Sequence, residues 1–194
     1  MEAGITSIVH EEVSPYQKIQ ILDTIDFGRF VLYTVQTDKN KTFLHTTALN
    51  IKAMQNVAQK SCRVLLLDGA VQLSEVDEVY SRSLLADSVY HQADVLILGG
   101  GDGALLAELL HHHQPRQVTM VELDGAVMRA VRDHMPSVTR GVLDCHTTER
   151  YNIITGDALK HLSDCQKENK KYDFIFGDLT DVPIDTDHHC QYHY

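Results

Sequence analysis

The sequence predicts an α/β fold, in which a mostly parallel, doubly wound sheet follows a small antiparallel β region. Three observations predict it. From Asp94 onward, apolar strand patterns alternate with amphipathic helical patterns. The first of these strands runs directly into a glycine-rich turn at 99–103. Before residue 90, short β-rich segments are separated by turn residues. The length of 194 residues suits one such domain with a small appendage.

The alternating part begins at Asp94 and supplies the elements of the parallel sheet. The predicted strands are 95–99, 118–122, 151–154 and 173–177, and the predicted helices are about 103–113, 124–134 and 156–168. Right-handed crossovers predict the strand order third, second, first, fourth, with ligands at the carboxyl ends between the first and the fourth. No further strand pattern follows the fourth, so we expect an open edge there.

The first ninety residues are predicted to form the antiparallel β region. Its expected strands are 19–22, 28–33 and 63–69. Between them, a polar segment of about 31–61 is interpreted as an inserted loop, with a weak helical pattern over 49–58. The predicted organisation is therefore a β region over 1–90, a nucleoside-binding domain over 91–184, which is incomplete, and an unpatterned tail over 185–194.

Composition narrows the possible partners. The formal net charge of −10 argues against nucleic acid and favours either plain solubility or a cationic ligand. No apolar stretch has the length of a membrane span, and no secretory signal begins the chain. The cysteines are scattered and form no Cys-x-x-Cys pair, which predicts reduced thiols and a cytoplasmic protein.

The glycine-rich turn indicates a nucleoside site. Glycines at 99, 101 and 103 let the backbone approach a ligand closely where the helix opens. The next strand ends in Glu122 and Asp124, where an acidic residue usually holds a ribose. Asp102, inside the turn, would repel a diphosphate and attract a cation, so the predicted ligand is a positively charged nucleoside. Asp102 is also a suitable helix N-cap, and both roles can coexist.

Several motifs in order resemble the aminopropyltransferases, the spermidine and spermine synthases. They are Ser14–Gln17, Leu67–Gln72, Glu75-Val-Asp77 with Tyr80, Gly99–Gly103, Glu122–Asp124, Gly156-Asp157 and Asp178–Ile184. The resemblance covers about residues 11–29 and 63–184 and implies a Rossmann-like, methyltransferase-type sheet. The ending Leu-Thr-x-Val-Pro-Ile is closer to spermine synthase, whereas Asp181 stands where spermidine synthases keep a second aspartate.

This resemblance implies transfer of an aminopropyl group from decarboxylated S-adenosylmethionine to spermidine, giving spermine and methylthioadenosine, with putrescine as the alternative acceptor. The nucleoside is a co-substrate, and neither a metal nor another cofactor is required. Asp178, at the end of the fourth strand, would act as general base on the attacking amine. Asp102 would hold an ammonium group, Tyr80 would hydrogen-bond the attacked amine, and Asp181 would join the amine site.

The nucleoside would bind along the carboxyl ends of the strands. The resemblance assigns the ribose hydroxyls to Glu122 and the adenine amino group to Asp157, and it places Gln17 near the thioether. Asp124 and Ala158 complete the expected nucleoside-binding set, together with the turn glycines Gly99, Gly101 and Gly103.

Other interpretations stay open at this point. A methyltransferase would use the same kind of sheet but would leave Asp102 and the Asp178 motif unexplained. A nicotinamide-dependent oxidoreductase conflicts with the same aspartate. By this resemblance, we expect the family pattern to stop at about Ile184, and we expect the chain to lack the extra N-terminal domain of animal spermine synthases. The third alternative is therefore a truncated, catalytically impaired polypeptide that binds nucleoside or pairs with a full-length homologue through its open edge. For the protein in general, the expected assembly is a homodimer or such a pairing. Histidines at 111–113 are interpreted as surface residues, and a metal site in the His188–His193 tail is disfavoured.

Overall fold

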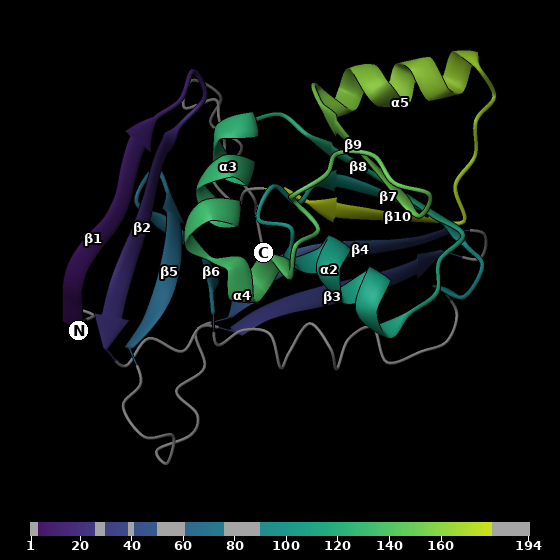
Figure 1. Cartoon of the computed structure of the whole chain (residues 1–194). Helices are drawn as coiled ribbons and strands as arrows, with labels where there is room; N and C mark the ends of the chain where they lie inside the picture. Colours follow the sequence, from purple (N-terminus) through teal and green to yellow (C-terminus); the bar gives the residue numbers. More distant parts are fainter. Residues whose placement is uncertain (1–3, 26–29, 39–40, 50–60, 76–89, 180–194) are drawn as a thin grey trace, which may run out of the picture.

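The computed structural model describes residues 4–25, 30–38, 41–49, 61–75 and 90–179 (Figure 1). The strands are β1 (Gly4–Val13), β2 (Lys18–Ile25), β3 (Phe30–Asp38), β4 (Lys41–Leu49), β5 (Ser61–Leu67), β6 (Ala70–Ser74), β7 (Asp94–Gly99), β8 (Gln117–Glu122), β9 (Tyr151–Thr155) and β10 (Phe174–Asp178). The helices are α2 (Ala104–His112), α3 (Gly125–His134), α4 (Pro136–Thr139) and α5 (Ala158–Lys167).

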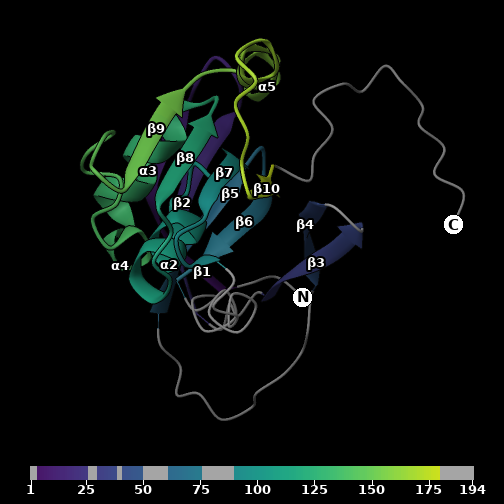
Figure 2. The ribbon, with the colours of Figure 1, turned by 90° about the vertical axis from the view of Figure 1, so that its right-hand side faces the viewer.

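The larger sheet confirms the predicted fold class. Its strand order is β3-β4-β10-β7-β8-β9, and β4, β10, β7, β8 and β9 are parallel (Figure 2). The segment β9-β8-β7-β10 is the predicted order of third, second, first and fourth strand. The four strands and three of the helices from Asp94 onward begin and end within about two residues of the predicted bounds, whereas the short helix α4 was not predicted. A clear alternation of strand and helix patterns is therefore enough to predict this part of the fold.

The polar segment 31–61 contains two strands, so its interpretation as a loop is wrong. β3 and β4 form an antiparallel hairpin, and β4 pairs with β10 through Phe43–His45. The expected open edge beside the fourth strand is therefore also wrong, because a segment from far earlier in the chain covers it. Residues 30–33, expected in the antiparallel region, lie instead in this hairpin. The weak helix over 49–58 falls almost entirely outside the described residues.

The smaller sheet is antiparallel and has the order β1-β2-β5-β6. The turn between β5 and β6 consists of Asp68 and Gly69, with φ values of 49° and 78°. Two successive positive φ values suit the right-handed twist of a tight hairpin, and Asp-Gly is a sequence that adopts them readily. The sequence predicted the antiparallel region and the strands β2 and β5, but it predicted neither β1 nor β6.

Helix α3 lies between the two sheets and joins their cores (Figure 1). One face of the large sheet packs against α2, with Ile97, Leu106 and Met120 fully buried. The small sheet packs its own apolar face, including Ile21 and Leu65, against the apolar side of α3. Among the helices that the structure describes, none combines the length and apolar character needed to cross a bilayer.

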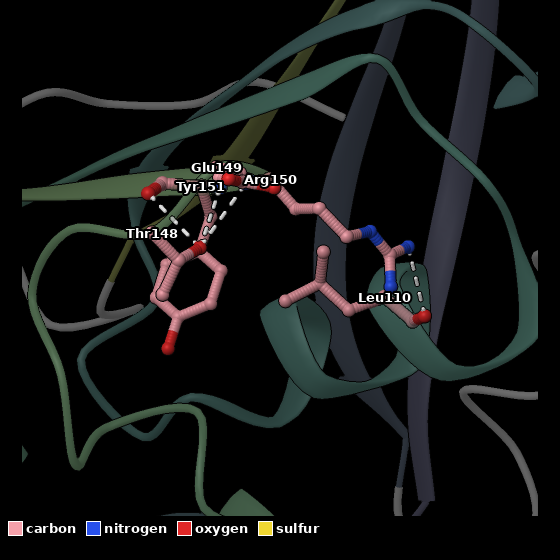
Figure 3. Close-up of a pocket in the computed structure, with 5 residues that line it drawn as sticks. All are labelled: Leu110, Thr148, Glu149, Arg150 and Tyr151. Atoms are coloured by element: carbon pink, nitrogen blue, oxygen red, sulfur yellow. Dashed lines mark hydrogen bonds between the residues drawn. The ribbon is translucent and has the colours of Figure 1, made fainter.

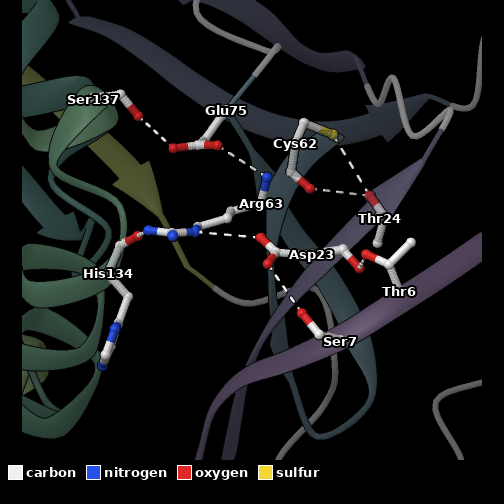
Figure 4. Close-up of polar contacts among 9 residues, drawn as sticks. All are labelled: Thr6, Ser7, Asp23, Thr24, Cys62, Arg63, Glu75, His134 and Ser137. Carbon is white, nitrogen blue, oxygen red and sulfur yellow. Dashed lines mark hydrogen bonds and ion pairs between the residues drawn. The ribbon is translucent and has the colours of Figure 1, made fainter. Parts of the chain in front are cut away.

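Polar contacts also join the small sheet to the carboxyl end of α3 (Figure 4). The Arg63 guanidinium on β5 donates to the carbonyl oxygen of His134 and contacts Asp23 Oδ1 at 3.4 Å. Glu75 accepts from the Arg63 backbone N–H and from the Ser137 hydroxyl. Because the last carbonyls of a helix lack partners within the helix, the Arg63 contact satisfies one of them.

Candidate active site

The carboxyl ends of β7 and β10 meet at the glycine-rich turn. Gly99 and Gly100 have φ values of 85° and 79°, a region that residues with a Cβ rarely adopt. The Gly100 N–H donates to the carbonyl oxygen of Asp178 at 3.0 Å. A Cβ on Gly99 would lie 2.0 Å from that same oxygen, so only glycine fits here. The sequence motif therefore reflects close contact between two backbones.

Asp178 lies at the end of β10, beside this turn, as the strand order predicted. One of its carboxylate oxygens, Oδ2, lies 3.3 Å from the position that a Cβ on Gly100 would occupy. The side chain is half-buried. Asp178 therefore lies at the turn, and its role as a general base stays a prediction.

Asp102 lies inside the turn, just before α2. Its Oδ1 accepts a hydrogen bond from the Ala104 N–H at 2.9 Å, although the N-cap residue itself is Gly103. Asp102 was expected to be the N-cap residue itself. Its side chain does bond to the start of α2, but from the position before the N-cap. Burial raises the pKa of Asp102 above its ordinary value, and the hydrogen bond from Ala104 partly offsets this effect. A cation at this carboxylate would favour its charged form.

Glu122 lies at the end of β8, directly across from the middle of the turn. Its Oε1 accepts from the Asp124 N–H at 2.7 Å. A Cβ on Gly101 would lie 2.8 Å from Glu122 Cδ and 2.9 Å from its Oε2, so this glycine makes room for the carboxylate. Burial raises the pKa of Glu122, and the negative charges of Asp124 and Asp102 add to the rise.

Asp124 and Gln17 come together, though they are 107 residues apart. The Gln17 amide donates to Asp124 Oδ2 at 3.1 Å, and the Ser14 hydroxyl donates to the same oxygen at 2.5 Å. Asp124 is also the N-cap of α3 and accepts from the Ala126 N–H. Its side chain is 3% exposed. Ser14 belongs to the motif Ser14–Gln17. The sequence could not indicate that it contacts Asp124, because this contact joins segments that are distant in the chain.

Asp157 follows β9 and is the N-cap of α5. Its Oδ1 accepts from the N–H groups of Leu159 and Lys160, at 2.7 and 3.4 Å. The N–H of Gly156 donates to the Glu122 carbonyl oxygen at 2.8 Å, which places the ends of β8 and β9 side by side. Asp157 is exposed, and Ala158 is the first residue of α5. Both remain predicted nucleoside contacts.

Two predicted residues, Tyr80 and Asp181, lie outside the described residues. Three apolar residues for which the sequence predicted no role of their own are exposed near the carboxyl ends of β8, β9 and β10. They are Leu123, Leu159 and Leu179, with exposed fractions of 37%, 76% and 61%. Their signal in the sequence was their position, within two residues of Glu122, Asp157 and Asp178.

A cavity of about 330 Å³ lies elsewhere, near the end of α2 and the start of β9 (Figure 3). It is lined by Leu110, Thr148, Glu149, Arg150 and Tyr151. The Arg150 guanidinium donates to the Leu110 carbonyl oxygen at 3.1 Å, so this arginine is engaged at the helix end. Because the glycine turn opens α2 and this cavity lies at the helix's other end, the two sites are separate. Within the described part of the chain, no cluster of three or more His, Cys, Asp or Glu could hold a metal ion.

Comparison with known proteins identifies relatives along most of the chain. The polyamine aminopropyltransferase of Pyrobaculum calidifontis is 32% identical over 91% of this chain and 50% of its own length. That of Pectobacterium atrosepticum is 37% identical over 61% of this chain and 41% of its own. The chain thus spans half or less of the length of these two relatives.

Solved structures show the same fold. A spermidine synthase from Thermotoga maritima superposes with a TM-score of 0.64 at 22% identity, over 93% of this chain and 50% of its own. A spermidine synthase in complex with the transition-state analogue AdoDATO gives a TM-score of 0.60 at 22% identity, over 92% and 48%.

Two family models match the chain. Residues 1–39 match the spermidine synthase tetramerisation domain, and residues 78–194 match the spermine/spermidine synthase domain. The second match covers more than half of the sequence and includes the glycine turn, Glu122 and Asp178. The chain therefore belongs to the spermine/spermidine synthase family.

Proposed function

We propose that this protein transfers the aminopropyl group of decarboxylated S-adenosylmethionine to a polyamine. The observation that carries the proposal is the meeting of acidic side chains at the glycine turn. Asp178 lies beside Gly100, Glu122 lies against Gly101, and Asp102 is part of the turn itself. The polyamine aminopropyltransferases among the relatives, and the spermidine synthase bound to AdoDATO, support this choice of reaction.

The electrostatics of the site favour a cationic substrate. Burial raises the pKa of both Asp102 and Glu122, because their charged forms are less stable in this site than in water. A sulfonium or ammonium group bound nearby would stabilise those charged forms. A diphosphate would be repelled by them, which argues against a dinucleotide ligand.

The proposed reaction needs a base and good positioning. A protonated amine has no lone pair, so Asp178 would accept a proton from the attacking amine. The amine nitrogen then forms a bond to the propyl carbon, and the bond between that carbon and the sulfonium sulfur breaks. The electron pair stays on sulfur, which gives neutral methylthioadenosine. Since the sulfonium is already an activated leaving group, holding two cations in line supplies much of the acceleration, and no metal is required.

We propose spermidine as the acceptor, so that the product would be spermine. The ending of the Asp178 motif, which resembles spermine synthase, supports this choice. Putrescine is the alternative, because Asp181 occupies the position of the second aspartate in spermidine synthases.

The test is to incubate the protein with decarboxylated S-adenosylmethionine and each amine in turn and to measure methylthioadenosine release. Asp178→Asn should lower turnover by roughly 100- to 10,000-fold while leaving methylthioadenosine binding within about threefold. Asp173→Asn is the matched control, because Asp173 lies just before β10 at its other end and accepts a hydrogen bond from the Asp94 N–H. Loss of binding and turnover together in Asp178→Asn would instead indicate a structural role. Nucleoside binding without turnover in the unaltered protein would favour the catalytically impaired alternative.

We further propose that the protein self-associates through its N-terminal sheet and acts in the cytoplasm. The match of residues 1–39 to a tetramerisation domain supports the proposed self-association. On β1, Ile5, Ile8 and Val13 are 58%, 60% and 77% exposed, which leaves apolar area for a second copy. Light scattering coupled to size exclusion should give the mass of an oligomer, and a monomer at about 50 µM would contradict the proposal.

A further inference from the structure

Asp124 is a nearly buried carboxylate that receives hydrogen bonds from two different parts of the fold. Its Oδ1 accepts from the Ala126 N–H at 2.9 Å and so caps α3. Its Oδ2 accepts from the Ser14 hydroxyl at 2.5 Å and from the Gln17 amide at 3.1 Å. Since a buried carboxylate is costly unless it is hydrogen-bonded, these donors hold Asp124 in one position.

The Ser14 hydroxyl is itself oriented toward Asp124. Ser14 Oγ accepts from the N–H groups of Tyr16 and Gln17, both at 3.1 Å. These two bonds occupy the acceptor positions of the hydroxyl and leave its hydrogen free to be donated. The nearest acceptor is Asp124 Oδ2, at 2.5 Å, whereas the Gln17 carbonyl oxygen lies 3.2 Å away. The turn between β1 and β2 therefore presents a fixed donor to the start of α3.

Asp124 in turn holds Glu122. The Asp124 N–H donates to Glu122 Oε1 at 2.7 Å, and the Glu122 carboxylate packs against Gly101 on its other side. The direction of that N–H depends on the backbone of Asp124, whose side chain is clamped from the other sheet. A continuous series of hydrogen bonds thus runs from Ser14 through Asp124 to Glu122.

We propose that Ser14 and Asp124 are positioning residues, which set the Glu122 carboxylate for the ribose hydroxyls of the nucleoside. This inference rests on the proposed function, because it takes Glu122 as the ribose contact. It assigns Asp124 an indirect role, through Glu122, in place of a direct contact with the nucleoside. The N-terminal sheet then contributes to nucleoside recognition from outside the nucleoside-binding domain.

The test compares two nucleosides by calorimetry: methylthioadenosine and its 2′,3′-dideoxy analogue, which lacks the ribose hydroxyls. Ser14→Ala should weaken methylthioadenosine binding about fivefold and leave binding of the analogue within about twofold, because only the former uses Glu122. Ser14→Thr, which keeps the hydroxyl, should restore the affinity. Ser7→Ala is the matched control, since Ser7 also donates to an aspartate, Asp23, at 3.0 Å, but at an exposed site of β1 (Figure 4).

Three outcomes would overturn the inference. Equal losses for both nucleosides in Ser14→Ala would show a general structural role, and unchanged binding of both would show that Ser14 does not act on Glu122. If the unaltered protein binds neither nucleoside, the proposed function itself fails. Should Ser14→Ala not fold, Asp124→Asn replaces it. Its Oδ1 still accepts from Ala126, but its amide faces the Ser14 and Gln17 donors, so the same selective loss is expected.

Discussion

Replacing Gly101 by alanine tests whether the glycine turn is shaped around the Glu122 carboxylate. The new Cβ would lie 2.8 Å from Glu122 Cδ and 2.9 Å from Cγ and Oε2. Ordinary carbon contacts are about 3.5–4.0 Å, so the carboxyl group must move by roughly 1 Å. Gly101 is not among the glycines with positive φ, so the substitution adds no backbone strain of that kind.

The expected loss of affinity in Gly101→Ala follows from the contacts that the Glu122 carboxylate loses. If the carboxylate moves, its 2.7 Å hydrogen bond from the Asp124 N–H is weakened or broken. A hydrogen bond to a charged group contributes about 1.5–3 kcal/mol, and overpacking costs a similar ~1–3 kcal/mol if the carboxylate stays. A loss of about 2 kcal/mol in the bound state corresponds to roughly 30-fold weaker binding of methylthioadenosine.

Two assays distinguish the outcomes. Calorimetry gives the affinity for methylthioadenosine, and urea unfolding gives the free energy of unfolding. Gly125→Ala is the control, since its Cβ would meet Arg129 and Thr155 only at 3.6 Å, an ordinary contact. It lies in the first turn of α3 and should raise stability by up to about 1 kcal/mol. A Gly101→Ala protein that binds the nucleoside as tightly as the unaltered chain would refute the reasoning.

The remaining predictions concern the pH dependence of stability, the carboxyl end of α3 and the contact between the ends of β7 and β10. Because burial raises the pKa of Glu122 above 4.5, its ionisation destabilises the folded protein as pH rises through that raised pKa. Glu122→Gln should therefore stabilise the ligand-free protein at pH 7, and the gain in thermal unfolding temperature should shrink toward pH 4.5; a constant gain would contradict the assignment. Arg63→Ala should lower the free energy of unfolding by about 1–3 kcal/mol in urea, because the His134 carbonyl loses its donor, whereas Arg132→Ala, at an exposed pair, should change it by less than about 0.5 kcal/mol. Gly99→Ala should destabilise the fold by roughly 3 kcal/mol or more, because its Cβ would overlap the Asp178 carbonyl, and a thermal transition matching the unaltered chain would contradict that.

Local patterns predicted the nucleoside-binding part of the fold well. The glycines at 99–103, the acidic residue after each strand and the apolar helix faces are each encoded within a few residues of one another. For that reason the order β9-β8-β7-β10 and the location of Asp178 beside the turn followed from general rules of connection.

The hairpin β3–β4 shows where such reasoning fails. Phe30–Asp38 is rich in Val, Thr, Tyr and Phe, a composition typical of strands. Its start lies in the predicted strand 28–33, but its polar neighbours suggested a loop for the rest. Even with the strands recognised, the sequence could not have indicated that β4 pairs with β10, about 130 residues later. Sheet neighbours are chosen by which exposed edge is available in the folded chain, and that is not a local property.

By itself, the sequence determined the family and the local motifs of this protein, a glycine turn and acidic strand ends, from which a cationic nucleoside is predicted. Tertiary structure alone decided how those groups are held. The sequence predicts Asp124 only as a nucleoside-binding residue. Folding brings Ser14 and Gln17 to its side chain from the other sheet, and the same side chain caps α3. The physical reason is that hydrogen-bond partners and burial, which set the position and pKa of a carboxylate, come from residues that are distant in sequence and adjacent only in the folded chain.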